Sequence, residues 1–188
     1  TACGLPSFLI YSYYFWKEDV KNNYYILNPE YYRDQEFQRI IYKLNQPYLR
    51  VNQSAFTNFS ILDRNYLAEM FGGRKFPNGE YVIDYIEEII DYQKAFMKVV
   101  SDVRSQNMFT FPVLTYSLLY QNGKFIDEDF ARWCSDHNTI WNDSNFFIGP
   151  DVTSLSSCCR LINDFSKLNG FINSIGGTSL KIGSIKVN

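Results

Sequence analysis

The fold is indicated most clearly by residues 81–120, in which YVIDYIEEIIDYQKAFMKVVSDVRSQ (81–106) is followed, after two residues, by FTFPVLTYSLLY (109–120). In the first segment the apolar residues recur at the spacing of one helical face, so the sequence predicts a long helix. In the second segment, aromatic and β-branched residues predict a buried strand. Pro112 fits such a strand only at a bulge or at a position that needs no ladder donor.

Helices and strands also alternate on either side of this stretch. A helix is predicted over 28–45, where Pro29 suits the first turn, and a strand is predicted over 51–60. The other predicted elements are a short helix capped by Asp63 that ends at Gly72-Gly73, turns at 76–80 and 122–123, a helix over 127–137, strands over 145–148 and 182–187, and a cysteine-bearing loop over 154–161. Strands that alternate with helices predict an α/β fold with a largely parallel sheet.

Length and composition restrict the class of protein. The 188 residues suit a single domain over 1–188, and the near balance of 18 Lys and Arg with 20 Asp and Glu argues against a duplex nucleic-acid partner. The apolar run 8–16 is too short to span a bilayer, so we assign it to the core. The chain starts at Thr1 and stops at Asn188 inside a predicted strand, and we therefore expect a fragment of a longer subunit.

The segment Ser156–Leu161 combines two thiols, Cys158 and Cys159, with the guanidinium of Arg160. One interpretation is a reactive site, because a nearby positive charge favours the thiolate and attracts phosphate. The other is that the cysteines are small buried hydrophobic residues. A disulfide between neighbours would be a strained ring, so we expect free thiols in a reducing cytoplasm. A zinc site is not predicted, because the chain has no Cys-x-x-Cys pair and its one histidine is His137.

The predicted strand over 51–60 carries a polar face. Its alternation places Ser54, Asn58 and Ser60 on one side. Such a face either lines a ligand site inside a barrel or faces water on an edge strand, and periodicity does not decide between them. His137 is a candidate general base by its chemistry, although the sequence identifies no partner for it.

Four segments resemble motifs of the anaerobic (class III) ribonucleotide reductases, and they occur in the same order along the chain. They are IYKLNQP (41–47) together with QSAFTNFS (53–60), FTFPVLTY (109–116), SCCRL (157–161) and GSI (183–185). The second part of the first motif departs from the family at Ala55, where the family often has Pro. Because four motifs in the family's order cover most of the chain, a chance match is improbable.

This resemblance implies a ten-stranded α/β barrel of the glycyl radical enzyme and ribonucleotide reductase type, in which a finger loop brings a cysteine to the centre. It implies an oxidoreductase that reduces ribonucleoside triphosphates to deoxyribonucleotides, for DNA replication, by radical chemistry. By motif position the thiyl radical forms on Cys159, Cys158 supports it or packs beside it, and Cys3 is the second redox cysteine that some members carry. The implied substrate-binding residues are Gln53, Ser54, Asn58 and Arg160.

The resemblance also implies cofactors and partners. This segment itself binds no cofactor and no metal. A glycyl radical, generated by a radical-SAM iron–sulfur activating enzyme, lies in a C-terminal part that is missing here, so the segment alone is expected to be inactive. The implied ligands are a ribonucleoside triphosphate substrate and ATP or dNTP effectors. We expect a cytoplasmic homodimer without nucleic-acid or membrane partners, with the helix over 81–106 as a candidate packing surface, and the reductant, formate or a small thiol protein, stays open.

Two other functions are considered. One is a non-catalytic binding or structural domain that shares the barrel, for example an aromatic-rich carbohydrate-binding module; the 15 Tyr, 16 Phe and 3 Trp fit it, but the helical periodicity does not. The other is a glycyl radical enzyme that acts on a different substrate, because a fold does not fix a function.

Overall fold

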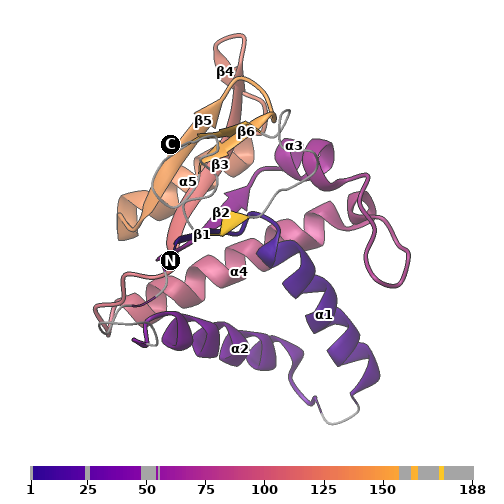
Figure 1. Ribbon diagram of the computed structural model, residues 1–188, viewed down its shortest axis with the longest axis vertical. Coiled ribbons are helices and arrows are strands. Elements are labelled where there is room, and N and C mark those ends of the chain that lie inside the picture. The colour runs from indigo at the N-terminus through magenta and orange to yellow at the C-terminus, as the bar shows by residue number, and fades with distance from the viewer. Residues whose placement is uncertain are drawn as a thin grey trace.

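The computed structural model describes residues 2–23, 26–47, 54, 56–156, 162–164 and 174–175. Helices and strands alternate along the chain (Figure 1). The elements are β1 (Ala2–Gly4), α1 (Phe8–Asn22), α2 (Pro29–Leu44), β2 (Phe56–Leu62), α3 (Arg64–Tyr66), η2 (Leu67–Phe71), η3 (Val82–Tyr85), α4 (Ile86–Arg104), β3 (Val113–Gln121), β4 (Lys124–Phe125), α5 (Glu128–Trp141), β5 (Ser144–Gly149), β6 (Ser154–Ser156), β7 (Ile162–Asp164) and β8 (Ser174–Ile175).

One sheet organises these elements. Its strands β1, β2, β3 and β5 are parallel to their neighbours, β8 is antiparallel to β1, and β4 forms a hairpin with the end of β3. Strand β2 lies between β1 and β3, so it is an internal strand. Helices connect the parallel strands, as parallel pairing requires. The prediction of an α/β fold with a largely parallel sheet is confirmed.

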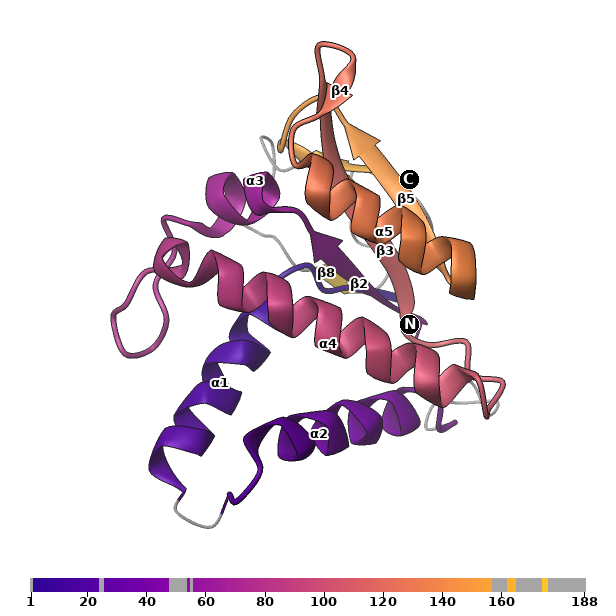
Figure 2. The same cartoon turned by 180° about the vertical axis from the view of Figure 1, so that it is seen from behind.

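The core lies between the sheet and the helices. The ring of Phe96 on α4 lies 5.1 Å from that of Phe37 on α2 and 5.7 Å from that of Phe59 on β2, between ring centroids. Phe59 also stacks on Phe8 of α1 at 4.5 Å. Figure 2 shows α4 and α5 on one side of the sheet, and Figure 1 shows β6 on the other side. We call these the helix face and the open face of the sheet.

Helix α4 is central to this core. Its buried residues are Ile89, Ile90, Tyr92, Gln93, Phe96, Met97, Val99, Val100, Ser101 and Val103. The apolar stripe that predicted the helix is therefore covered within the chain itself, and dimer packing through the rest of this helix stays a prediction. No helix among the described residues combines the length and the apolar character needed to cross a membrane.

Several predicted boundaries differ from the structure. The apolar run 8–16 forms the first part of α1, and it lies in the core only in part, because Leu9, Ile10, Tyr13 and Tyr14 are buried but Phe15 is exposed. Helix α5 continues to Trp141 and is followed by Asn142 in the left-handed conformation, a common helix end. Residues 154–156 were predicted as loop but form β6, because their backbone pairs with β7. The predicted strand over 182–187 lies outside the described residues.

The start of β3 is fixed by Asn45, the residue after α2. Its amide nitrogen donates to the carbonyls of Ile41 (2.8 Å) and Phe111 (2.6 Å), and its amide oxygen accepts from the N–H groups of Thr110 (3.1 Å) and Phe111 (3.0 Å). The side chain of Arg104 holds the same segment by donating to the carbonyls of Thr110 and Pro112. The asparagine of the first motif thus ties the end of α2 to the strand of the second motif.

Candidate functional site

A polar surface lies on the open face of the sheet. Residues that pair in parallel strands point to the same face, and Ser60 pairs with Thr115, which in turn pairs with Asn145. The same alternation adds Asn58 and Ser117. We call this set the polar face; its members are Asn58 and Ser60 on β2, Thr115 and Ser117 on β3, and Asn145 on β5.

Four of these side chains are almost completely buried, with exposed fractions of 0% for Asn58 and Ser117 and 2% for Ser60 and Thr115. The Thr115 hydroxyl donates to the amide oxygen of Asn58 at 2.9 Å, which orients the Asn58 amide group. Within the described part of the chain, the amide nitrogen of Asn58 and the hydroxyl oxygens of Ser60 and Ser117 are buried without a hydrogen-bond partner.

Unpaired buried polar atoms are costly, because folding removes their hydrogen bonds to water and supplies none in return. Three of them on two adjacent strands therefore indicate a surface built to bind something. Since β2 is an internal strand, the alternative of an edge strand facing water is wrong. The remaining alternative, a ligand surface, agrees with the position of Asn58.

Strands β6 and β7 lie over this side of the sheet. They form an antiparallel pair in which Ser156 is the partner of Ile162, and β6 contacts both β3 and β5. In Figure 1, β6 crosses in front of β3 and β5, on the side away from α5. The two strands that flank residues 157–161 are therefore placed on the open face. The predicted site residues Cys158, Cys159 and Arg160 in that interval, and Gln53, lie outside the described residues.

The structure does not bring Cys3 together with Asn58. Cys3 pairs with Thr57 on β2, and Thr57 points to the helix face, where it lines a hollow with Leu5 and Phe8. Cys3 is a free, partly exposed thiol on that face. Ser54 precedes β2, and its hydroxyl donates to the carbonyl of Gln46 at 3.4 Å. Redox and substrate roles for these two residues stay predictions.

Three residues of the polar face were missed by the sequence analysis: Thr115, Ser117 and Asn145. In the segment 109–120, Thr115 and Ser117 alternate with bulky residues, and this alternation is the signal that was available. Their relation to Asn58 depends on strand register, which the sequence does not state. The sheet thus extends the predicted site from one strand to three.

His137, the candidate general base, lies on the helix face. Its Nδ1 is 2.8 Å from the hydroxyl of Tyr116, and its Nε2 is 3.2 Å from the hydroxyl of Ser101. Ser101 donates its own proton to the carbonyl of Met97 at 3.0 Å, so it accepts from Nε2–H, and Nδ1 accepts from Tyr116. Both imidazole nitrogens are bonded to buried side chains, so we assign the partly buried His137 a structural role.

Burial lowers the pKa of His137, and this gives a pH dependence of stability. The unfolded chain takes up the proton near pH 6.5, but the folded chain does so only at lower pH. The free energy of unfolding is therefore expected to fall as the pH falls through about 6.5. In His137→Gln the free energy of unfolding should no longer fall with pH through this group. The measurement is the urea unfolding midpoint of wild type and variant, compared at each pH from about 8 to 5. Parallel pH profiles for the two proteins would contradict the assignment.

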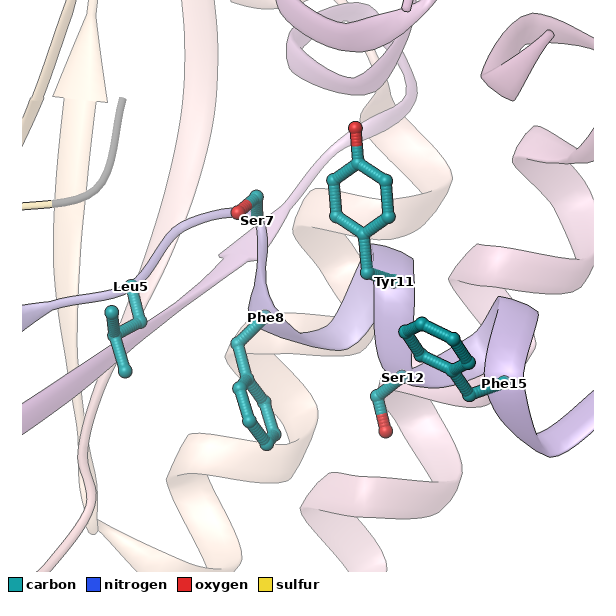
Figure 3. A pocket seen from close by; sticks show the side chains of 6 residues that line it. All are labelled: Leu5, Ser7, Phe8, Tyr11, Ser12 and Phe15. Carbon is teal, nitrogen blue, oxygen red and sulfur yellow. The ribbon is translucent and has the colours of Figure 1, made fainter. Parts of the chain in front are cut away.

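A second concave surface, of about 420 Å³, runs along the start of α1. Figure 3 shows the side chains that line it, which are Leu5, Ser7, Phe8, Tyr11, Ser12 and Phe15. None of them is charged, and Leu5 and Phe8 also line the hollow beside Thr57 on the helix face. The concave surface along the start of α1 therefore lacks the chemistry of a catalytic site. In the part of the chain that is described, His, Cys, Asp and Glu side chains do not gather in a group of three that would hold a metal ion.

Comparison with solved structures finds anaerobic ribonucleotide reductases. The Thermotoga maritima enzyme with citrate in the active site matches with a TM-score of 0.73 and 44% identity over 79% of this chain and 26% of that chain. The same enzyme with dATP bound in the specificity site matches with a TM-score of 0.74 and 45% identity over 79% of this chain and 25% of that chain. Its complex with dATP and CTP matches with a TM-score of 0.75 and 45% identity over 83% of this chain and 26% of that chain. The chain thus spans about a quarter of the length of these enzymes.

A comparison with curated proteins gave no significant match. A model of one protein family, described as anaerobic ribonucleoside-triphosphate reductase, matches residues 1–188. The fold agrees with this match, since 79% of the chain aligns with the Thermotoga enzyme at a TM-score of 0.73. The chain belongs to the anaerobic ribonucleoside-triphosphate reductase family.

Proposed function

We propose that this chain forms part of the catalytic barrel of an enzyme that reduces ribonucleoside triphosphates to deoxyribonucleotides. The observation that carries the proposal is the polar face, which belongs to a sheet of this family and presents unpaired hydrogen-bonding atoms on a buried surface. In the proposal, the sheet continues into a ten-stranded barrel, and β6 and β7 are the two sides of the finger loop.

The chemistry of the polar face suggests which part of the substrate it binds. The five members of the polar face carry no charge and offer only amides and hydroxyls. Hydroxyls and amides suit the neutral hydroxyl groups of a ribose. A triphosphate needs positive charge, and in the proposal Arg160 supplies part of it. The Thermotoga complex described with dATP and CTP supports nucleotide ligands for this chain.

The proposed reaction begins with a thiyl radical on Cys159. Its sulfur takes the hydrogen atom from the 3′ carbon of the ribose, which forms an S–H bond and leaves a carbon radical. The 2′ hydroxyl then takes up a proton and leaves as water, a reductant supplies two electrons that with a second proton form the new C–H bond at the 2′ carbon, and the S–H bond returns its hydrogen to the 3′ carbon. A dry barrel interior protects such radicals from solvent. In this scheme Cys158 packs beside Cys159.

The remaining parts of the proposal concern the longer protein. They are a glycyl radical outside this segment, its formation by a radical-SAM iron–sulfur enzyme, control by ATP and dNTP effectors, a homodimer and a cytoplasmic location. The structure of the Thermotoga enzyme described with dATP in a specificity site supports the effectors. A glycyl radical enzyme with a different substrate is the second candidate, and binding of ribonucleoside triphosphates by the full-length protein would separate the two.

Ser117→Ala tests the polar face in the full-length protein. If the hydroxyl binds substrate, its removal should raise KM for a ribonucleoside triphosphate about 3- to 10-fold, the value of one hydrogen bond. Because the Ser117 hydroxyl has no partner among the described residues, the variant should be as stable as wild type or more so. KM is measured in an anoxic turnover assay, and stability by thermal unfolding.

Ser101→Ala is the matched control. Ser101 is also buried, with 1% exposure, but its hydroxyl bonds to Met97 and His137 on the helix face. This variant should lose stability and keep its KM. A Ser117→Ala protein that loses stability at unchanged KM would show that the hydroxyl is structural, and it would count against substrate binding on this face.

A further inference from the structure

The connection between β5 and β6 is held by the hydroxyl group of Tyr66. This side chain is fully buried, and its oxygen lies 3.1 Å from the carbonyl oxygen of Asp151 and 3.2 Å from that of Ser154. Burial raises the pKa of Tyr66, so the phenol keeps its proton and remains a donor. One O–H group is thus shared between two carbonyls at the two ends of a turn, the second of which is the first residue of β6.

The position of Tyr66 is itself fixed by the sheet. The carboxylate of Asp63, which is 1% exposed, accepts from the backbone N–H of Tyr66 on one oxygen and from that of Leu119 on β3 on the other, both at 2.8 Å. A continuous set of contacts therefore runs from β3 through Asp63 and Tyr66 to the start of β6. The sheet also holds the turn through Gln121, whose side chain donates to the carbonyl of Pro150 at 2.7 Å.

Gly149, the last residue of β5, makes room for this contact. A Cβ atom at this position would lie 2.8 Å from the Tyr66 hydroxyl and 3.2 Å from the carbonyl oxygen of Asp151. The φ angle of Gly149 is not positive, so the backbone itself would accept alanine. The glycine is therefore required by close approach, above all of the Tyr66 hydroxyl and also of the Asp151 carbonyl, and not by its own backbone conformation.

We propose that Tyr66 is a positioning residue for the reaction: its hydroxyl, seated against Gly149, sets where β6 and β7 cross the polar face. Those strands flank the segment that carries Cys158 and Cys159, so this inference rests on the proposed function. Leu155, buried to 1% exposure, packs the middle of β6 into the core. The two carbonyl contacts of Tyr66 hold the first residue of β6 and the turn before it.

The test compares variants of the full-length enzyme. Tyr66→Phe keeps the ring and removes the hydroxyl, and it should lower kcat about 10-fold or more, because small displacements of a reacting group are costly, while KM changes less than about twofold. Gly149→Ala should also lower kcat. Its effect should be smaller in a Tyr66→Phe background, because the oxygen that the new methyl group meets is gone.

Two controls separate positioning from general loss of stability. Tyr92→Phe removes another buried tyrosine hydroxyl, bonded to Ser12 at 2.9 Å between α1 and α4, and should keep the wild-type kcat. In Gly73→Ala the added Cβ would meet no atom within 4 Å, so this variant should also keep the wild-type kcat. Wild-type kcat in Tyr66→Phe, or an equal loss in Tyr92→Phe, would overturn the proposal.

Hydrogen exchange of the backbone amides in β6 tests the positioning role of Tyr66 separately from the proposed function. Should the wild-type protein reduce no ribonucleotide, the proposed function fails, and the positioning role is then judged by the backbone amides of residues 154–156. Their exchange should be about 10-fold faster in Tyr66→Phe, the effect of losing roughly 1.4 kcal/mol of local stability, and unchanged in Tyr92→Phe. Equal exchange rates in wild type and Tyr66→Phe would overturn the positioning role.

Discussion

Cys159→Ala is expected to abolish the formation of deoxyribonucleotides by the full-length protein, with a loss of about 10⁴-fold or more. The proposed reaction needs a sulfur atom that gives up and takes back one hydrogen atom, and an alanine methyl group has no bond weak enough to do so. The loss should be in kcat, because the side chain acts on the reacting carbon and contributes little to binding. The measurement is product formation in an anoxic assay.

Variants of two other cysteines show whether the loss of activity is specific to Cys159. Cys134→Ala should retain activity, because Cys134 is completely buried on α5 on the helix face. Burial also raises the pKa of its thiol, which keeps it unreactive. Cys158→Ala should retain part of the activity, in line with a packing role. Wild-type turnover in Cys159→Ala, or complete loss in Cys158→Ala alone, would contradict the assignment of the two roles.

Phe96→Ala is expected to lower the free energy of unfolding by about 3–5 kcal/mol, the usual cost of removing a large buried aromatic side chain. Phe96 has 0% exposure and joins three layers, since its ring contacts Phe37 on α2 and Phe59 on the sheet. The resulting cavity would lie under the polar face, on the opposite side of β2. The measurement is the shift of the urea unfolding midpoint of the full-length protein.

Phe15→Ala provides the comparison. Phe15 lies on α1 with 57% exposure, so its removal should change the free energy of unfolding by less than about 0.5 kcal/mol. A similar shift for both variants would mean that Phe96 does not occupy the core position described here.

The long elements of the fold were predictable because their signals are local. Helix α2 was predicted from Pro29 and its apolar spacing, and in the structure the Asn28 side chain accepts from the N–H of Tyr31 at its start. Likewise, the Asp63 side chain caps the helix that follows it, as predicted. Strand β6 was not predictable, because three residues with one apolar side chain carry no periodicity and form a strand only through pairing with β7.

The candidate site was predictable only in part, because its assembly depends on strand register. Asn58 was identified from its motif, but the sequence around Ser117 does not indicate that its strand pairs with β2. Cys3 illustrates the same limit in the other direction. Its distance in sequence from Asn58 does not reveal that pairing with Thr57 turns its side chain to the helix face. Tyr66 was read as part of a short helix, and its contact with a turn more than 80 residues later is visible only in three dimensions.

Hydrogen abstraction from the ribose by Cys159 is tested most directly by supplying the full-length protein, activated under anoxic conditions and given a reductant, with a ribonucleoside triphosphate deuterated at the 3′ carbon. The expected product is a deoxyribonucleotide that keeps deuterium at the 3′ carbon, because Cys159 returns the atom it removed, and turnover should be slower than with the unlabelled substrate. An activated protein that binds the ribonucleotide but forms no deoxyribonucleotide would contradict it.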